Sequence, residues 1–138
     1  MSEPNMRIHI AVMSLILPFA WFFGLSRAEW GVLILSIGFV LAAELFNTSV
    51  EKVSDAVTEE YSEFIKLSKD ISAGAVIVAA VTAVFVGVAL FGDFKRIWET
   101  LTYIVTHIHA FIIFLIIFIS DIYFLIRKNK KGNFYGKE

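Results

Sequence analysis

Four long stretches of the chain carry almost no charged side chains, and shorter polar segments separate them. The stretches are 8–25, 30–46, 71–91 and 104–126, of which the second is interrupted by Glu44 and the fourth by Asp121. A helix that crosses a bilayer needs roughly 17–25 mainly apolar residues, and each stretch approaches or reaches that length. We therefore predict an all-α, polytopic transmembrane helical bundle with no room for a separate soluble domain.

The connections between these stretches differ in kind. Only Ser26 to Glu29 separate the first two spans, which predicts a tight antiparallel hairpin. Residues 47–70 mix charged and apolar side chains, so we expect the second helix to continue past the membrane and to turn near residues 58–62 before the third span. Small residues recur every fourth position in the third span, which allows close helix packing. An oligomer interface and packing within one chain explain this spacing equally well.

Composition supports a membrane protein and excludes several other classes. Of the 138 residues, 58% are hydrophobic, whereas ordinary soluble domains have about 45–50%. The chain has no cysteine, which excludes disulfides and thiol chemistry. Its formal net charge of −1 makes nucleic acid an unsuitable partner.

Basic residues are unequally divided between the two sides of the predicted bundle. One side carries Arg7, Lys52, Lys66, Lys69, Arg127, Lys128, Lys130, Lys131 and Lys137, and the other carries Arg27, Lys95 and Arg96. Because cytoplasmic loops are enriched in lysine and arginine, we expect both termini and residues 47–70 in the cytoplasm. The basic tail that follows the fourth span fits an anchor against anionic lipid.

A polar stripe begins where the second span ends. Glu44, Asn47, Glu51 and Asp55 follow one another at steps of three, four and four residues, so they share one helical face. A carboxylate near hydrocarbon is costly and is therefore a candidate functional group. A structural alternative stays open, in which Glu44 bonds a neighbouring helix and the other acids are ordinary solvated charges.

Several motifs at fixed spacing resemble those of a known family. The stretch AELFNTSVEKVSD (43–55), the entry NMRIH (5–9), the pair EY (60–61) and the stretch KDISAGA (69–75) occur in the family's order. Together they resemble the small bacterial membrane lipid kinases, the prokaryotic diacylglycerol kinase and undecaprenol kinase family. The resemblance covers about residues 3–91, and the residues of the motifs are more similar to those of the undecaprenol kinase branch.

The resemblance implies an architecture and a reaction. It implies three spans per subunit, a homotrimer, and active sites between subunits near the cytoplasmic face. It implies Mg²⁺ and ATP as phosphate donor and a membrane lipid alcohol as acceptor, with undecaprenol or diacylglycerol as candidates. We accordingly divide the chain into a lipid kinase-like transmembrane domain, residues 1–91, and an additional transmembrane helix with a basic cytoplasmic tail, residues 92–138.

The resemblance also assigns roles to particular residues. Glu44 matches the general base that takes the proton of the lipid hydroxyl. Glu3 and Glu51 match magnesium-binding glutamates close to the nucleotide. The nucleotide site is completed by Glu60, Tyr61, Lys69 and Asp70, and the lipid head is contacted by Asn5, Arg7, His9 and Asn47 together with Glu44.

Phosphoryl transfer depends on positioning and charge stabilisation, which such carboxylates and a lysine can supply. The chain has no G-x-x-x-x-G-K-[ST] motif, which argues against a soluble-type kinase.

The chain departs from the family pattern at its start and end. Few residues precede the entry motif, where the family has an amphipathic surface helix, so either the nucleotide site lacks parts or the true start lies upstream. Ser62 replaces a family histidine, and the fourth span has no counterpart in the short members. Two alternatives to a lipid kinase therefore remain: a catalytically silent packing partner, and an ion or proton pathway lined by Glu44 and Asp121.

Overall fold

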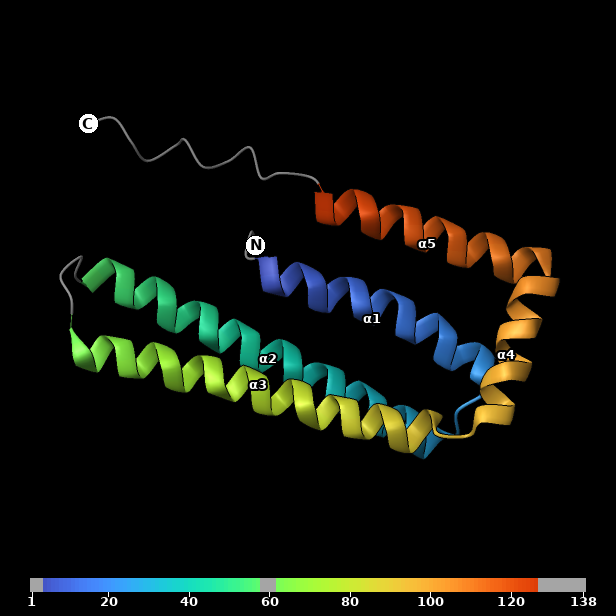
Figure 1. The fold of residues 1–138 in the computed structure, drawn as a ribbon, viewed down its shortest axis with the longest axis horizontal. Helices are drawn as coiled ribbons and strands as arrows, with labels where there is room; N and C mark the ends of the chain where they lie inside the picture. Colours follow the sequence, from blue (N-terminus) through green and yellow to red (C-terminus); the bar gives the residue numbers. More distant parts are fainter. Residues whose placement is uncertain (1–3, 58–61, 127–138) are drawn as a thin grey trace.

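The computed structural model describes residues 4–57 and 62–126, and within these residues all the regular structure is helical. The elements are α1 (Pro4–Phe23), α2 (Arg27–Val57), α3 (Glu63–Phe91), α4 (Phe94–Thr106) and α5 (Ile108–Ile126) (Figure 1). The predicted all-α fold is confirmed. The turn expected near residues 58–62 coincides with the gap between α2 and α3, most of which lies outside the described residues.

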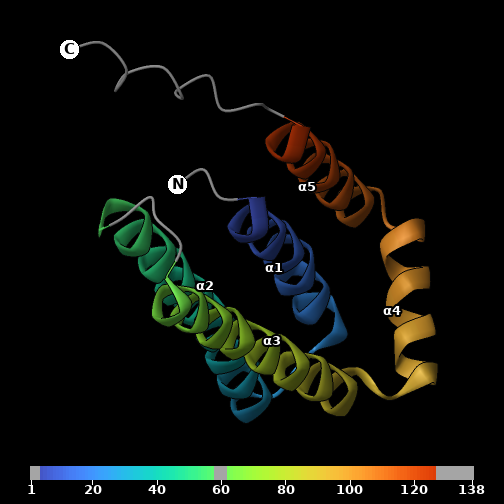
Figure 2. The same ribbon diagram turned by 60° about the vertical axis from the view of Figure 1, so that its left-hand side comes forward.

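The helices form two antiparallel pairs joined at one end. α2 and α3 pack along each other as a long hairpin, while α5 packs along α1 (Figures 1 and 2). α4 crosses the end of the bundle and contacts both α1 and α5. Within the described chain, α1, α2, α3 and α5 are long and apolar enough to cross a membrane, which confirms the predicted integral membrane bundle.

Two of the spanning helices are longer than a bilayer requires. α2 has 31 residues and α3 has 29, so at 1.5 Å per residue they extend about 46 and 44 Å, against roughly 30 Å of hydrocarbon. They project past the Pro4 end of α1 at the end of the bundle opposite α4 (Figure 1). Glu51, Lys52 and Asp55 lie in the last third of α2, so this projection carries them out of the apolar layer.

The link between α1 and α2 is as short as predicted. Gly24 ends α1 with a φ of 74°, a conformation that only glycine adopts without strain, and its N–H donates to the Ala20 carbonyl at 3.1 Å. Ser26 and Glu29 then bond each other reciprocally: the Ser26 N–H donates to Glu29 Oε2 at 2.7 Å, and the Glu29 N–H donates to Ser26 Oγ at 3.3 Å. This capping box starts α2 at Arg27.

The fourth span is shorter than the uncharged stretch 104–126 that predicts it. α4 ends at Thr106 and α5 starts at Ile108, so the span begins four residues later than expected. At the break, the Thr106 hydroxyl donates to the Thr102 carbonyl at 2.7 Å, while His107 has an extended backbone and stacks on Tyr103 at 3.8 Å. No helix was predicted for residues 92–103, whereas most of them form α4, which Asp93 caps by accepting the Arg96 N–H at 3.1 Å.

Specific contacts attach α4 and α5 to α1. At one end, the Arg96 guanidinium donates to the Gly24 carbonyl at 2.6 Å and lies 4.3 Å from the Phe23 ring centroid. At the other end, Arg7 lies 4.7 Å from the ring centroid of Phe124. Residues 92–126 therefore dock on the first helix of the bundle.

Between these ends, Ser14 of α1 bonds Asp121 of α5. Its Oγ lies 2.6 Å from Asp121 Oδ2 and 2.7 Å from the Ala11 carbonyl oxygen. A hydroxyl has one hydrogen, so Ser14 Oγ shares it between Asp121 Oδ2 and the Ala11 carbonyl oxygen. We therefore predict that Asp121→Asn, whose amide oxygen can accept from Ser14 in the same place, keeps the stability of the bundle.

Asp121→Leu removes this bond and should destabilise the bundle by about 1 kcal/mol, a typical value for a hydrogen bond between membrane helices. Thermal unfolding of the purified protein in detergent measures both variants. An asparagine variant as unstable as the leucine variant would show that the hydrogen bond from Ser14 does not account for the stabilisation.

Candidate functional site

Glu44 is the most deeply buried carboxylate of the described chain. Its side chain is 1% exposed, and its Oε2 atom is buried without a hydrogen-bond partner among the described residues. Leaving a buried polar atom unpaired costs roughly 1–3 kcal/mol, and more for a charged group. Such an atom calls for an explanation, and in a membrane helix the leading one is a functional group.

One and two helical turns further along α2, a chain of hydrogen bonds joins α2 to α3. Asn47, which is 5% exposed, accepts from the Ser72 hydroxyl at 2.7 Å and donates from Nδ2 to Glu51 Oε1 at 3.1 Å. The serine fixes the orientation of the amide, and the amide in turn holds one oxygen of the Glu51 carboxylate. The structure thus joins two residues of the predicted stripe, Asn47 and Glu51, to Ser72 in one polar cluster, which begins one turn beyond the buried Glu44.

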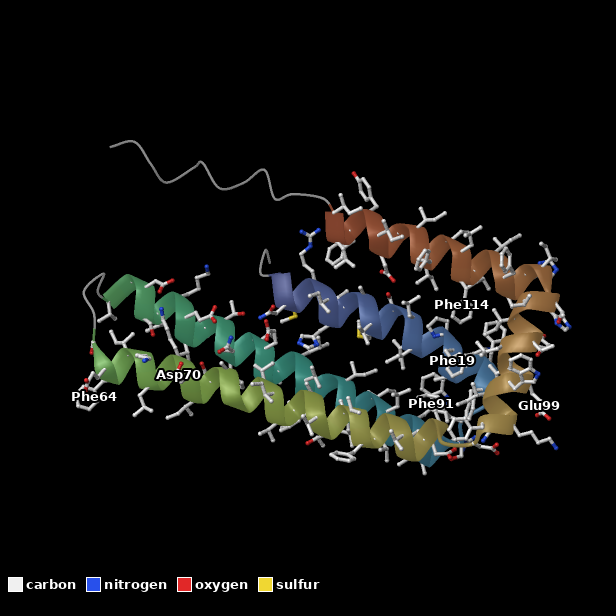
Figure 3. All side chains as sticks on the ribbon, viewed as in Figure 1. Phe19, Phe64, Asp70, Phe91, Glu99 and Phe114 are labelled. Atoms are coloured by element: carbon white, nitrogen blue, oxygen red, sulfur yellow. The ribbon has the colours of Figure 1, made fainter. Side chains whose placement is uncertain are left out.

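The fourth residue of the stripe pairs with a predicted nucleotide-binding lysine. Lys69 Nζ lies 2.7 Å from Asp55 Oδ1, in the part of α2 and α3 that projects beyond the apolar layer. The hydrogen bond from Lys69, reinforced by its charge, holds the pKa of the Asp55 carboxyl below its ordinary value. Asp70 is exposed and takes no part in this pair (Figure 3). The structure therefore places Lys69, but not Asp70, against the α2 stripe.

The predicted lipid-contacting residues of α1 do not share one face: Asn5 and His9 are four residues apart on one side of the helix, and Arg7 lies on the other. Asn5 is exposed, while His9 is half-buried and lines an apolar cavity between α1, α2 and α3. Arg7 is half-buried and turns toward Phe124 of α5. These three side chains therefore do not form one cluster within the chain.

Three predicted site residues lie outside the described residues, namely Glu3, Glu60 and Tyr61. Conversely, Ser72 belongs to the polar cluster and was missed by the sequence analysis. Its position three residues after Lys69 puts it on the same face of α3, which was the available signal.

Among the described residues, Glu51 has a carboxylate oxygen that could bind a metal ion. Within residues 4–57 and 62–126, no three acidic or histidine side chains gather into a metal-binding group. Magnesium usually takes one or two carboxylates and completes its coordination with water and substrate phosphates. Glu51 can supply one such carboxylate, since only its Oε1 atom is engaged by Asn47.

The fold and this cluster together define an integral membrane protein with a carboxylate-centred site at the edge of its apolar layer. A family model described as prokaryotic diacylglycerol kinase matches residues 1–91, about two thirds of the chain. The chain belongs to the prokaryotic diacylglycerol kinase family, as its motifs predict. It is therefore a lipid kinase, a phosphotransferase with an alcohol group as acceptor.

Two curated relatives agree with this assignment. Undecaprenol kinase of Bacillus subtilis is 34% identical over 90 residues, which cover 65% of this chain and 73% of the relative. Diacylglycerol kinase of a Synechocystis species is 38% identical over 87 residues, which cover 62% of this chain and 50% of the relative. No solved structure is significantly similar to this chain.

Proposed function

We propose that this chain transfers the γ-phosphoryl group of ATP to the hydroxyl of a membrane lipid alcohol at the cytoplasmic face of a bacterial inner membrane. Undecaprenol is the first candidate acceptor and diacylglycerol the second, since relatives of both names are similar to this chain. The observation that carries the proposal is the buried Oε2 of Glu44, which has no hydrogen-bond partner among residues 4–57 and 62–126 and lies one turn from a polar cluster that leads out of the apolar layer.

Glu44 orients the lipid hydroxyl and takes its proton. The hydroxyl oxygen then forms a bond to the γ-phosphorus, while the bond to the bridging oxygen of ADP breaks. Glu44 suits this role because a carboxylate at the membrane edge meets the head of an acceptor whose tail stays in hydrocarbon. Such a base typically contributes 10²- to 10⁴-fold to a rate.

The nucleotide binds further out, where α2 and α3 project from the membrane. Glu51, and Glu3 outside the described residues, would hold Mg²⁺, which would neutralise charge on the phosphates. Lys69 stands beside this position with its ammonium group on Asp55, and a nucleotide phosphate can replace that carboxylate as its partner. Asp70, Glu60 and Tyr61 complete the proposed nucleotide site.

Asn5, Arg7, His9 and Asn47 are the proposed contacts to the lipid head. Because Arg7 lies on the opposite face of α1 from Asn5 and His9, one chain does not gather these contacts, and we expect a second copy of the chain to complete the site. We propose a homotrimer with both termini of each subunit in the cytoplasm, and we assign residues 92–138 as an addition to a kinase domain formed by residues 1–91.

A panel assay tests the proposal directly. The purified full chain in lipid-containing micelles receives labelled Mg-ATP with undecaprenol, diacylglycerol or ceramide in parallel, and label in the extracted lipid is counted. We expect the highest kcat/KM with undecaprenol. Intact, folded protein that labels none of the three would support the silent-partner alternative instead. Proton flux into liposomes in the absence of ATP would support the pathway alternative.

A further inference from the structure

Ser72 of α3 connects its own helix to α2 through one hydroxyl group. Its Oγ lies 2.7 Å from Asn47 Oδ1 on α2 and 2.9 Å from the Lys69 carbonyl oxygen on α3. Both of these oxygens are acceptors, so the serine is the donor and shares its single hydrogen between them. Since α2 and α3 pack along each other (Figure 1), Ser72 ties the amide of Asn47 to the backbone that carries Lys69.

The hydrogen bonds on its two sides leave the Asn47 amide one suitable orientation. An amide offers an acceptor oxygen and a donor nitrogen, whereas a carboxylate only accepts. Nδ2 donates to Glu51 Oε1 at 3.1 Å, and Oδ1 accepts from Ser72 at 2.7 Å. A flipped amide would set its oxygen against the Glu51 carboxylate, where the two acceptors repel each other. Ser72 and Glu51 therefore select the same orientation, and the three groups form one ordered chain.

Burial prevents solvent from taking over the role of the serine. Asn47 is 5% exposed, and Ser72 is half-buried. Without the hydroxyl, Oδ1 of Asn47 would stay buried without a donor, and leaving such an atom unpaired is costly. An amide that moves to find another donor loosens its hold on Glu51. The orientation of the Glu51 carboxylate thus depends on a side chain of the other helix.

The consequence falls on the Glu51 oxygen that Asn47 does not hold. Asn47 bonds Oε1, so Oε2 is left to accept a metal ion. Residues that bond metal ligands orient them, and changing such residues lowers metal affinity or activity 10- to 100-fold. Asn47 stands in this position toward Mg²⁺, and Ser72 stands one bond further out. Because Nδ2 carries two hydrogens, its bond to Glu51 leaves one for the proposed contact with the lipid head.

We propose that Ser72 is a positioning residue, which sets the affinity for Mg²⁺ by holding the Asn47 amide against Glu51. This inference rests on the proposed function, because it takes Glu51 as a magnesium ligand. The resemblance to the family assigns no role to Ser72. Its contribution follows from the packing of α3 on α2, and it acts through Asn47 without touching nucleotide or lipid.

Nucleotide binding without turnover tests this role. A non-hydrolysable ATP analogue is titrated calorimetrically into the purified full chain, once with saturating Mg²⁺ and once without Mg²⁺. Ser72→Ala should raise the Kd measured with Mg²⁺ about tenfold, the lower end of the range for residues that support metal ligands. The Kd measured without Mg²⁺ should stay within about twofold, because only the metal-dependent part of the affinity passes through Glu51.

Ser68→Ala is the matched control. Ser68 lies one turn earlier on α3, is exposed, and donates to the Phe64 carbonyl of its own helix at 2.9 Å. The change removes a bond within α3, as Ser72→Ala does, but no bond to α2 among the described residues. Both Kd values should therefore stay within about twofold of the unmodified chain, as is usual for an exposed position.

Two outcomes in Ser72→Ala would overturn the proposal. One is a Kd with Mg²⁺ that equals that of the unmodified chain. The other is an equal rise of the Kd with and without Mg²⁺, which would indicate general damage to the site. Ser72→Cys keeps nearly the shape of serine with a much weaker donor, so it provides a second test should the alanine variant fail to fold. Its Kd with Mg²⁺ should rise about threefold, and an unchanged value would count equally against the proposal.

A double-mutant cycle tests whether Ser72 acts through Asn47. Asn47→Ala removes the amide that the hydroxyl holds, so adding Ser72→Ala to it should change the Kd with Mg²⁺ by less than about twofold. Additive losses would show that Ser72 influences the metal by another route, and would overturn its role through Asn47.

Failure of this inference is distinguishable from failure of the proposed function. An unmodified chain that labels no acceptor lipid in the panel assay refutes the proposed function. An unmodified chain that labels the acceptor, and whose gain in nucleotide affinity with Mg²⁺ persists in Ser72→Ala, refutes only the role of Ser72.

Discussion

Replacing Glu44 by glutamine is expected to lower lipid phosphorylation by about 10²- to 10⁴-fold, the usual contribution of a general base. Glutamine has nearly the same shape as glutamate but cannot accept the hydroxyl proton. The fold should tolerate the change, because Oε2 of Glu44 bonds no described residue and no hydrogen bond to that atom is lost. Initial rates of label transfer from ATP to the acceptor lipid, at saturating concentrations of both, measure the effect.

Glu63→Gln is the matched control, since Glu63 is an exposed glutamate in the first turn of α3 and lies outside the proposed reaction centre. It should retain activity within about twofold, as is usual for an exposed surface position. The Glu44 variant should also keep the oligomeric size and the unfolding temperature of the parent protein. Full activity of Glu44→Gln would exclude Glu44 as the general base. The proposed mechanism would then lose its main structural support.

The spans could be predicted from the sequence because their signal is local. Long uncharged stretches predict membrane helices by length alone. The capping residues Ser26 and Glu29 mark the link at which α1 has ended and α2 begins. The stripe at Glu44, Asn47 and Glu51 could be predicted for a similar reason, since spacing along one helix fixes which side chains share a face. Burial of Glu44 and Asn47 agrees with that face pointing inward.

α4 was missed although its own pattern contains a signal. Phe94, Ile97, Trp98, Leu101 and Ile104 follow helical spacing directly after the capping residue Asp93. The charges and threonines between them lower the hydropathy of the segment, so it does not stand out beside four far more apolar stretches. The break at His107 could not be foreseen, because it depends on Thr106 bonding back to the helix and on the ring stacking over Tyr103.

Contacts between helices could not be predicted from one sequence. Both Asp55 and Lys69 were identified as polar residues of interest, but their pairing depends on how the α2–α3 hairpin closes. The same holds for Ser72, which reaches Asn47 only because α3 turns that face to α2. Docking of α5 on α1 through Asp121 and Ser14 joins residues 107 positions apart, a separation that no local pattern encodes.

Replacing Glu51 by glutamine should have the second largest effect, a loss of at least about 100-fold in kcat/KM at low Mg²⁺. Replacing residues that only support metal ligands already lowers metal affinity or activity 10- to 100-fold. Glu51 is half-buried, and Asn47 holds one of its oxygens at 3.1 Å, so its carboxylate is fixed in place before any nucleotide arrives. Glutamine can still bond Asn47, but it lacks the negative charge that magnesium requires of a strong ligand.

The measurement that isolates this role is the dependence of the phosphorylation rate on Mg²⁺ concentration at fixed ATP. In Glu51→Gln, the half-saturating Mg²⁺ concentration should rise at least about tenfold, and excess Mg²⁺ should restore part of the rate. Glu44→Gln should instead stay slow at every Mg²⁺ concentration, and its half-saturating Mg²⁺ concentration should equal that of the parent protein. The two variants differ because the proton acceptor and the metal ligand act on opposite ends of the reacting bond. If Glu51→Gln and Glu44→Gln respond identically to Mg²⁺, the division of the α2 stripe into a base and a metal-binding carboxylate is wrong.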